Sequence, residues 1–359
     1  MSTHTAALDV DVELPYDALV SYHYFRSDQT MTELTDHGRL RLIADSGAFS
    51  AYTQGVRIDL DEYAAWLKTW SPRLYWAAAL DVFGDPDTTY RNWATLRDTH
   101  GLTTVPTIHI GADPRHLDVY ADQGVDFVGL GGMVGMPKPN ITRWLVHVMR
   151  YARDHHPQMR FHAWGMSTQT LLEELPLYSV DSSGLLTQAY RYGTLALFNP
   201  RSRRMVSIDL NGRDPLKYRR LLLDTYGIPP REVATSHPGN RHLLARLCAR
   251  SSQLRAQYLQ RLHKVTPPSW GINPHWNTHT RTSDHPVGPL MHAVSTRNND
   301  LNDATTGPRP HLLDGMEGNT KLTHPATPEP EPGPRMHVVA NTTNLRRLHT
   351  PREEGDPLK

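Results

Sequence analysis

Several aspartates come directly after short apolar runs, at points where a strand would end. Asp45 follows the run 40–44 and precedes Ser46 and a glycine, and Asp81 and Asp181 follow two later runs. Two carboxylates beside the anomeric carbon of a sugar can perform glycosyl transfer, because one attacks the carbon while the other moves protons. For any single aspartate, a helix cap or a loop turn is the alternative interpretation.

Other distinctive residues follow the remaining apolar runs. His109 lies in VPTIHIG, Gly131 and Gly132 in VGLGGMVG, and Trp164 in FHAWGMST. A wall of glycines lets a flat ring approach backbone N–H and C=O groups, and a third carboxylate can accept from the N–H donors of guanine. The alternatives are a flexible loop for the glycines and a polar loop position for the histidine. The combination favours base exchange over aldolase or phosphate-binding chemistry.

These residues must be positioned by elements that alternate along the chain up to about residue 265. Helical patterns such as 61–70, 86–100, 113–124 and 140–156 separate the apolar runs. Eight repeats of this kind predict an α/β fold, a (β/α)8 TIM-like barrel over residues 1–215, whose strand ends meet at one rim. A doubly wound sheet is the alternative. The expected strands are 18–22, 40–44, 74–80, 104–108, 127–130, 160–163, 177–180 and 205–208.

Two further regions follow the expected barrel. Residues 216–265 predict a helical basic extension, with one long helix at 241–264, and residues 266–359 predict a disordered polar tail rich in Pro, Thr, Asn and His. A chain ending near residue 265 is therefore expected to fold. Basic residues near the end of the barrel and on the long helix could hold nucleic-acid phosphates or form a solvated surface. They are Arg201, Arg203, Arg204, Lys217, Arg219, Arg220, Arg246 and Arg250.

Composition limits the remaining possibilities. The formal net charge of +1 does not indicate a nucleic-acid binder, so any such surface must be local. The single cysteine excludes an intramolecular disulfide and a multi-cysteine zinc site. No secretory signal and no apolar stretch of about 18 residues is visible, so we expect a soluble, cytoplasmic protein without membrane contact.

The motifs DSGAF, LD, GLGGMVG and VDSS resemble, in this order, those of the tRNA-guanine transglycosylases (queuine tRNA-ribosyltransferases). That superfamily has (β/α)8 barrels that exchange guanine for a 7-deazaguanine. The resemblance, over residues 40–185, implies that Asp181 is the nucleophile and Asp45 the general acid/base. It places Ser46, Asp81, His109, Gly131, Gly132 and Trp164 around the base, although the family usually has glutamine in place of the histidine.

Departures from the tRNA enzymes favour a related branch. Those enzymes hold zinc with three cysteines and a histidine, which this chain cannot supply, so no cofactor is expected. The compact barrel and the basic extension look like the phage DNA-guanine transglycosylases, which insert 7-deazaguanines such as 7-cyano-7-deazaguanine into DNA. The expected partners are DNA and a 7-deazaguanine base, with a homodimer or a partner protein left open. If phage-encoded, the protein would act in the host cytoplasm.

Other functions remain as alternatives. Within the same class, the substrate could be tRNA or a free nucleoside. The 21 histidines suggest a metal-dependent barrel hydrolase as an alternative, although no HxH or HExxH motif follows an early strand. A nucleic-acid-binding module without catalysis would need no paired carboxylates, which argues against it.

Overall fold

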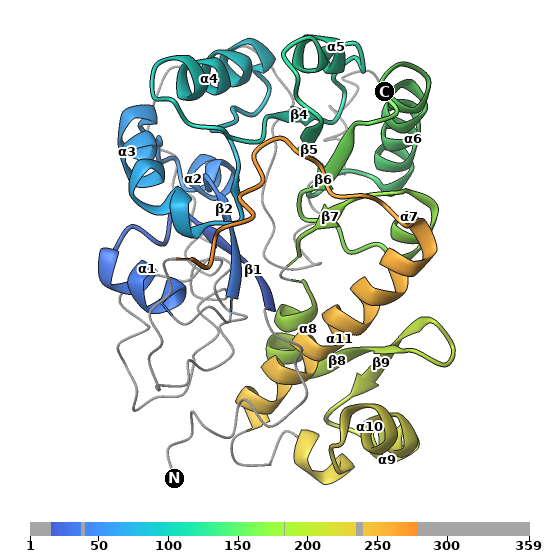
Figure 1. Cartoon of the computed structure of the whole chain (residues 1–359). Coiled ribbons are helices and arrows are strands. Elements are labelled where there is room, and N and C mark those ends of the chain that lie inside the picture. Colours follow the sequence, from blue (N-terminus) through green and yellow to red (C-terminus); the bar gives the residue numbers. More distant parts are fainter. Residues whose placement is uncertain (1–15, 37–39, 183, 235–239, 279–359) are drawn as a thin grey trace, which may run out of the picture.

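The computed structural model describes residues 16–36, 40–182, 184–234 and 240–278. The fold mixes helices with parallel and antiparallel strands (Figure 1). In chain order, the strands are β1 (Tyr16–Ser21), β2 (Leu40–Asp45), β3 (Trp76–Ala77), β4 (Thr107–His109), β5 (Phe127–Gly131), β6 (Arg160–Ala163), β7 (Ser179–Val180), β8 (Thr194–Asn199) and β9 (Arg204–Asp209).

Helices connect the parallel strands and cover their outer faces (Figure 1). Those of the first part are α1 (Asp28–Thr35), α2 (Ala48–Thr53), α3 (Leu60–Trp70), η2 (Ser71–Arg73), α4 (Pro86–Asp98), α5 (His116–Ala121), α6 (Lys138–His155) and α7 (Gln169–Glu174). They are followed by α8 (Gly184–Tyr192), α9 (Asp214–Lys217), α10 (Arg219–Tyr226), η3 (Pro230–Val233) and α11 (Asn240–His263).

The first seven strands are parallel and follow one another in sequence order. One sheet has the order β1-β2-β3 and the other β4-β5-β6-β7. A parallel bridge between Ala78 and Val105 connects the end of β3 to the residues before β4. The expected mixed α/β fold with parallel strands is confirmed, and each of the first seven expected strands overlaps an observed one.

The two sheets face each other across a shared interior. The hydroxyl oxygens of Tyr75, before β3, and Tyr178, before β7, lie 2.9 Å apart. Further along, the ring centroid of Trp76 on β3 lies 5.0 Å from that of His162 on β6. Since β3 and β6 are not neighbours in the strand order, these contacts require strongly curved sheets.

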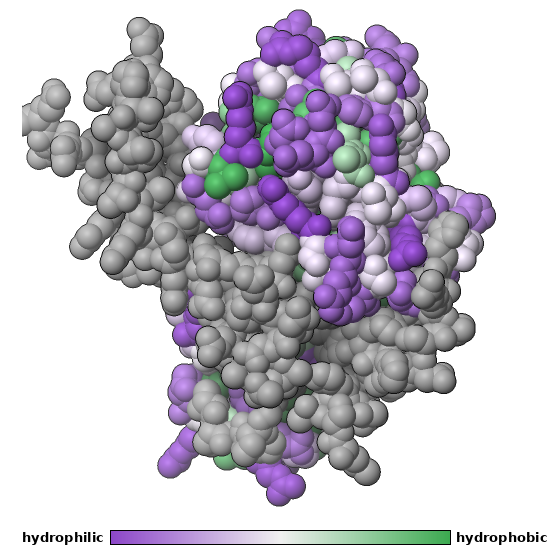
Figure 2. All heavy atoms as spheres, turned by 90° about the vertical axis from the view of Figure 1, so that its left-hand side faces the viewer, coloured by the Kyte–Doolittle hydropathy of each residue, from purple (hydrophilic) through white to green (hydrophobic). Residues whose placement is uncertain are grey.

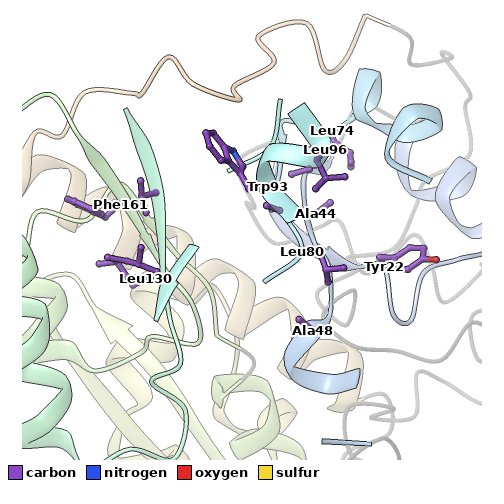
Figure 3. Close-up of a cluster of buried hydrophobic side chains, with 14 of the residues drawn as sticks. Tyr22, Ala44, Ala48, Leu74, Leu80, Trp93, Leu96, Leu130 and Phe161 are labelled. Atoms are coloured by element: carbon purple, nitrogen blue, oxygen red, sulfur yellow. The ribbon is translucent and has the colours of Figure 1, made fainter. Parts of the chain in front are cut away.

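Apolar side chains from both sheets and their helices form the main core. Figure 3 shows Ala44, Leu74 and Leu80 on the β2–β3 side, with Leu130 and Phe161 on the β5–β6 side. Burial of such side chains is the main favourable contribution to folding. The core therefore holds both groups of strands, and with them the residues at their ends.

The eighth expected strand is wrong as part of a parallel barrel. Residues 205–208 lie in β9, which pairs antiparallel with β8, a strand that the pattern did not predict. A turn of only a few residues joins the two, with Arg203 at φ 57°, whereas a parallel crossover needs a dozen or more residues. The hairpin therefore cannot continue the parallel order.

The hairpin belongs to a second hydrophobic core with α8, α10 and α11. Leu195 and Leu197 of β8 are fully buried there beside Leu247 of α11. The Ser251 hydroxyl accepts a hydrogen bond of 2.8 Å from the backbone N–H of Phe198, which ties α11 to β8. This packing places residues 194–209 with the helical extension rather than with the parallel strands.

Part of the expected tail is packed against the strands. We call residues 266–278 the strap; it crosses the amino ends of the strands as the orange trace in Figure 1. The carboxylate of Asp126, just before β5, accepts from the backbone N–H groups of Ser269 and Trp270. Trp270 Nε1 also donates to the carbonyl of Thr104, at 2.9 Å. The prediction of a tail beginning at residue 266 is wrong for these residues.

The strap continues to the start of β3. The Asn273 backbone N–H donates to the carbonyl of Tyr75, and Ile272 packs beside Trp76 and Phe127. Trp276 is also buried. Composition concealed these apolar anchors, because Pro and Asn surround them. The rest of the expected tail, 279–359, lies outside the described residues.

Hydrophilic side chains dominate the described surface on the side of α1 and α3, with small scattered hydrophobic areas (Figure 2). Among the helices in the described ranges, none combines the length and the hydrophobicity needed to span a lipid bilayer.

Candidate active site at the strand ends

The three aspartates predicted from the sequence lie together. Asp45 ends β2, Asp81 follows β3 and Asp181 follows β7, all at the carboxyl ends of parallel strands. Burial, followed by the charges of Asp81 and Asp181, raises the pKa of Asp45 to about 8. Like charges add to the effect of burial only when they lie close to the group. The structure therefore brings the three carboxyl groups into one site.

The DSG turn holds Asp45 in a constrained position. Its Oδ2 accepts a hydrogen bond of 3.0 Å from the backbone N–H of Gly47. Gly47 has φ 78°, and a Cβ there would lie 2.4 Å from both Ser21 Oγ and the Cβ of His23. A side chain at position 47 would clash, so the turn that holds the carboxylate requires glycine. Gly47, rather than Asp45, is the N-cap residue of α2.

Asp81 is paired with His109. The Nε2 atom of His109 lies 2.7 Å from Oδ2 of Asp81. Ser46 Oγ lies 3.5 Å from the other oxygen of Asp81, at the limit of a hydrogen bond. Phe83 stacks on the imidazole with ring centroids 4.9 Å apart. Three predicted base-binding residues thus form one connected group.

The glycines of β5 lie against this group. A Cβ at Gly131 would be 3.0 Å from Cδ2 of His109, and Gly132 has φ 73°. Gly129, which sequence reasoning did not single out, is more crowded, because a Cβ there would lie 2.5 Å from Nε1 of Trp164. The close approach of side chains to bare backbone explains why β5 carries glycine at this end.

Trp164 forms part of the same wall. Its Nε1 donates to Thr107 Oγ1 at 3.1 Å, which joins the residue after β6 to β4. Its ring packs against His162, at 4.1 Å between centroids, and against Trp76, at 5.8 Å. The tryptophan is therefore held on its polar edge and by both of these rings.

Asp181 is held by two donors. Oδ1 accepts from the backbone N–H of Gly165 at 2.8 Å and lies 3.3 Å from Nε2 of His162. Asp181 is 18% exposed, whereas His162 is fully buried. Sequence reasoning missed His162, although it stands two residues before Trp164 in the quoted motif FHAWGMST.

A cavity of about 590 Å³ lies between α4 and α5, beside the site. Tyr90 and Tyr120 line it together with His109 and His116. In the part of the chain that the structure describes, His, Cys, Asp and Glu side chains form no group of three or more arranged to hold a metal ion.

The expected phosphate-binding residues belong to the β8–β9 hairpin, the α9–α10 segment and α11, and not to the seven parallel strands. Those of the β8–β9 turn and of the α9–α10 segment are exposed, and Arg201 forms an ion pair with Asp224 of α10 at 3.6 Å. We call this group the basic cluster. It consists of Arg201, Arg203, Arg204, Lys217, Arg219 and Arg220.

The two arginines expected on the long helix differ from the basic cluster. Arg246 is only 9% exposed, and Arg250 is partly buried. The expectation that Arg246 belongs to a solvated or phosphate-binding surface is therefore wrong.

The chain was compared with models of known protein families and with curated proteins, and it matches none of them.

Proposed function

We propose that the protein is a base-exchange glycosyltransferase that replaces guanine in DNA with a 7-deazaguanine. The observation that carries this proposal is the group of Asp45, Asp81 and Asp181, with the pKa of Asp45 raised to about 8. A carboxyl group that keeps its proton near neutral pH beside two other carboxylates is suited to general acid catalysis. Binding alone would not need this arrangement.

We propose that the parallel strands form a barrel of the (β/α)8 type, with the active site at their carboxyl ends. Seven parallel strands in sequential order, with side-chain contacts between β3 and β6, support this assignment. The antiparallel hairpin does not supply an eighth parallel strand. We propose that α8 and α11 complete the wall between β7 and β1.

In the proposed first step, Asp181 attacks C1′ of the target nucleoside. The new O–C1′ bond forms as the C1′–N9 bond breaks, and the electron pair leaves with guanine. Among the described residues, both donors to Asp181 contact Oδ1. Oδ2 is then the oxygen that attacks.

Asp45 would move the proton in both directions. It protonates the departing guanine, which neutralises the charge left by the broken bond. When the 7-deazaguanine enters, the resulting carboxylate accepts the proton from N9, and N9 attacks C1′ and displaces Asp181. A pKa of about 8 keeps Asp45 protonated for the first half of this cycle at neutral pH.

The group around Asp81 would recognise the base. Its carboxylate can accept from the ring N–H and exocyclic amine of guanine, with Ser46 and His109 beside it. Gly131 and Gly132 would offer backbone groups to the edge of the ring, and Trp164 would form a wall of the pocket. This proposed chemistry uses side chains and backbone alone.

DNA must present an unstacked guanine to this pocket, so the protein would flip the base or act on single strands. The exposed basic cluster would bind the phosphates. The chain has one cysteine, which is buried, so the Cys3His zinc site of the tRNA enzymes cannot form. These features favour DNA over tRNA.

Mass spectrometry of nucleosides from cells that express the protein tests the substrate. We expect a 7-deazaguanine in DNA, present with the unaltered protein and absent with Asp181→Ala. Its appearance in tRNA instead would support the tRNA alternative. Full incorporation with Asp181→Ala would exclude Asp181 as the nucleophile, and a stoichiometric catalytic metal in the purified protein would favour the hydrolase alternative.

A further inference from the structure

A buried histidine lies directly behind the proposed nucleophile. The Nε2 atom of His162 lies 3.3 Å from Asp181 Oδ1, and its Nδ1 lies 2.8 Å from Ser179 Oγ. His162 and Ser179 are paired in the register of β6 and β7, so the backbone fixes one side of this arrangement. The imidazole therefore connects a strand residue to the carboxylate beyond the strand end.

The partners of His162 determine where its proton lies. An ionised carboxylate can only accept hydrogen bonds, so Nε2 must carry the proton that points to Asp181. Nδ1 is paired with the hydroxyl of Ser179, so both ring nitrogens have a hydrogen-bond partner.

Two indole rings prevent the imidazole from turning. Trp164 and Trp76 contact it with edge geometry, at centroid distances of 4.1 and 5.0 Å. Trp164 is itself held by its hydrogen bond to Thr107. Rotation of His162 would have to displace these rings.

We propose that His162 is a positioning residue that aims Asp181 at the sugar. It holds Oδ1 together with the N–H of Gly165, so that Oδ2 is directed toward C1′. The inference rests on the proposed role of Asp181 as the nucleophile. His162 is not the proton donor in this mechanism, because the proton that the departing base needs comes from Asp45. Misplacing a reacting atom by about 1 Å can reduce a rate by about 100-fold.

A chain of Ser, His and Asp also occurs in hydrolases, where the serine attacks and the histidine removes its proton. In this protein the aspartate, and not the serine, lies beyond the end of the strand. Ser179 lies within β7, whereas Asp181 lies beyond its end, with the other carboxylates. This placement assigns the attack to the aspartate and the anchoring role to the serine.

The test measures single-turnover formation of the covalent adduct between the full-length protein and a guanine-containing DNA oligonucleotide. His162→Gln can place an amide N–H near the position of Nε2, whereas His162→Asn reaches only toward Ser179. We expect the Asn variant to form adduct about 100-fold more slowly at unchanged KM for DNA, and the Gln variant to recover at least about tenfold. Ser179→Ala should still form the adduct, and His147→Gln, at an exposed position on α6, should match the unaltered protein.

Different results would overturn different claims. Equal rates in the Asn variant and the unaltered protein, or equal losses in the Gln and Asn variants with normal thermal unfolding, would exclude positioning through Nε2. Loss of all activity in Ser179→Ala would support a serine nucleophile instead. If the unaltered protein forms no adduct that depends on Asp181, the proposed function fails, and the inference fails with it.

Discussion

The imidazole of His109 lies 2.7 Å from the carboxylate of Asp81, and the two side chains are only 14% and 15% exposed. Phe83 covers one face of the imidazole, and Gly131 leaves room beside it. The contact thus fixes the orientation of a partly buried carboxylate at the strand ends. In the proposed function, this carboxylate reads the hydrogen-bond donors of guanine.

Asp81→Asn should weaken base recognition, because a charged acceptor is replaced by an amide that also presents N–H donors to the base. A lost hydrogen bond to a charged group costs about 1.5–3 kcal/mol, so the KM for free base should rise about 10- to 100-fold. Exchange of labelled guanine into DNA measures this constant. His109→Gln retains a donor toward Asp81, so its KM for free base should stay within about threefold of that of the unaltered protein. An unchanged KM in the Asn variant would exclude Asp81 from base recognition.

The raised pKa of Asp45 predicts how activity depends on pH. The proposed general acid loses its proton as the pH rises past its pKa of about 8, so exchange should decrease above this pH. Asp81→Asn removes one of the two charges that raise this pKa, and the decrease should then begin at lower pH. A pH profile with the same upper limb in both proteins would contradict this assignment.

The same group predicts how stability depends on pH. The pKa of Asp45 is raised from 3.8 to about 8, so the folded state holds the proton more tightly than the unfolded state. Proton binding by Asp45 therefore contributes fully to the free energy of unfolding at acidic pH. This contribution is lost as the pH rises from about 4 to 8, at up to about 1.4 kcal/mol per pH unit. Denaturant unfolding of Asp45→Asn should lack this component. If the free energy of unfolding changes with pH in the same way in both proteins, Asp45 does not contribute to this dependence.

The basic cluster predicts a salt-dependent interaction with DNA. Arg203→Gln combined with Arg204→Gln should weaken binding and reduce the slope of log affinity against log salt by about 1 for each lost phosphate contact. Fluorescence anisotropy with labelled oligonucleotides measures both quantities. The control is Arg153→Gln on α6, an exposed arginine that pairs with its neighbour Asp154. If Arg153→Gln changes the affinity and the slope equally, net charge and not the position of the arginines determines DNA binding.

The strap predicts where the chain can be shortened. A chain ending after residue 278 should unfold at nearly the same temperature as the full chain, whereas one ending after residue 265 loses the contacts of Trp270 and Asn273. We expect the shorter chain to unfold at a temperature at least several degrees lower, since about 1 kcal/mol corresponds to about 2–4 °C at this size. Trp270→Ala in the full chain should show part of this loss. Equal stability of the two shortened chains would contradict a structural role for the strap.

Much of the parallel part could be predicted from the sequence, because buried strands appear as apolar runs. The run 127–130 corresponds to β5 almost to the residue, and the convergence of Asp45, Asp81 and Asp181 follows from parallel strand order. The hairpin was not predictable in this way, since an apolar run does not record the direction of its partner. Residues 205–208 were therefore assigned to the wrong sheet.

Other features depend on partners that are distant in the sequence. The position of His162 behind Asp181 follows from its register with Ser179, which no local pattern states. The strap donates hydrogen bonds to the carboxylate of Asp126 and to backbone carbonyls. Its own composition is typical of an unpacked segment and does not indicate these contacts. Arg246 was expected at a solvated or phosphate-binding surface, and it is buried, because helical periodicity does not tell which neighbours cover a face.

The strap also imposes an order of events on synthesis. The ribosome makes it after every described strand, yet it completes the amino ends of β3, β4 and β5. At about 5–20 residues per second, roughly 5–20 seconds separate the end of β7 from the end of the strap. During this interval the carbonyl groups of Thr104 and Tyr75 lack their final partners in the strap. Among the described residues the strap is the last segment to be made, so the amino ends of these three strands can be completed only at the end of this interval.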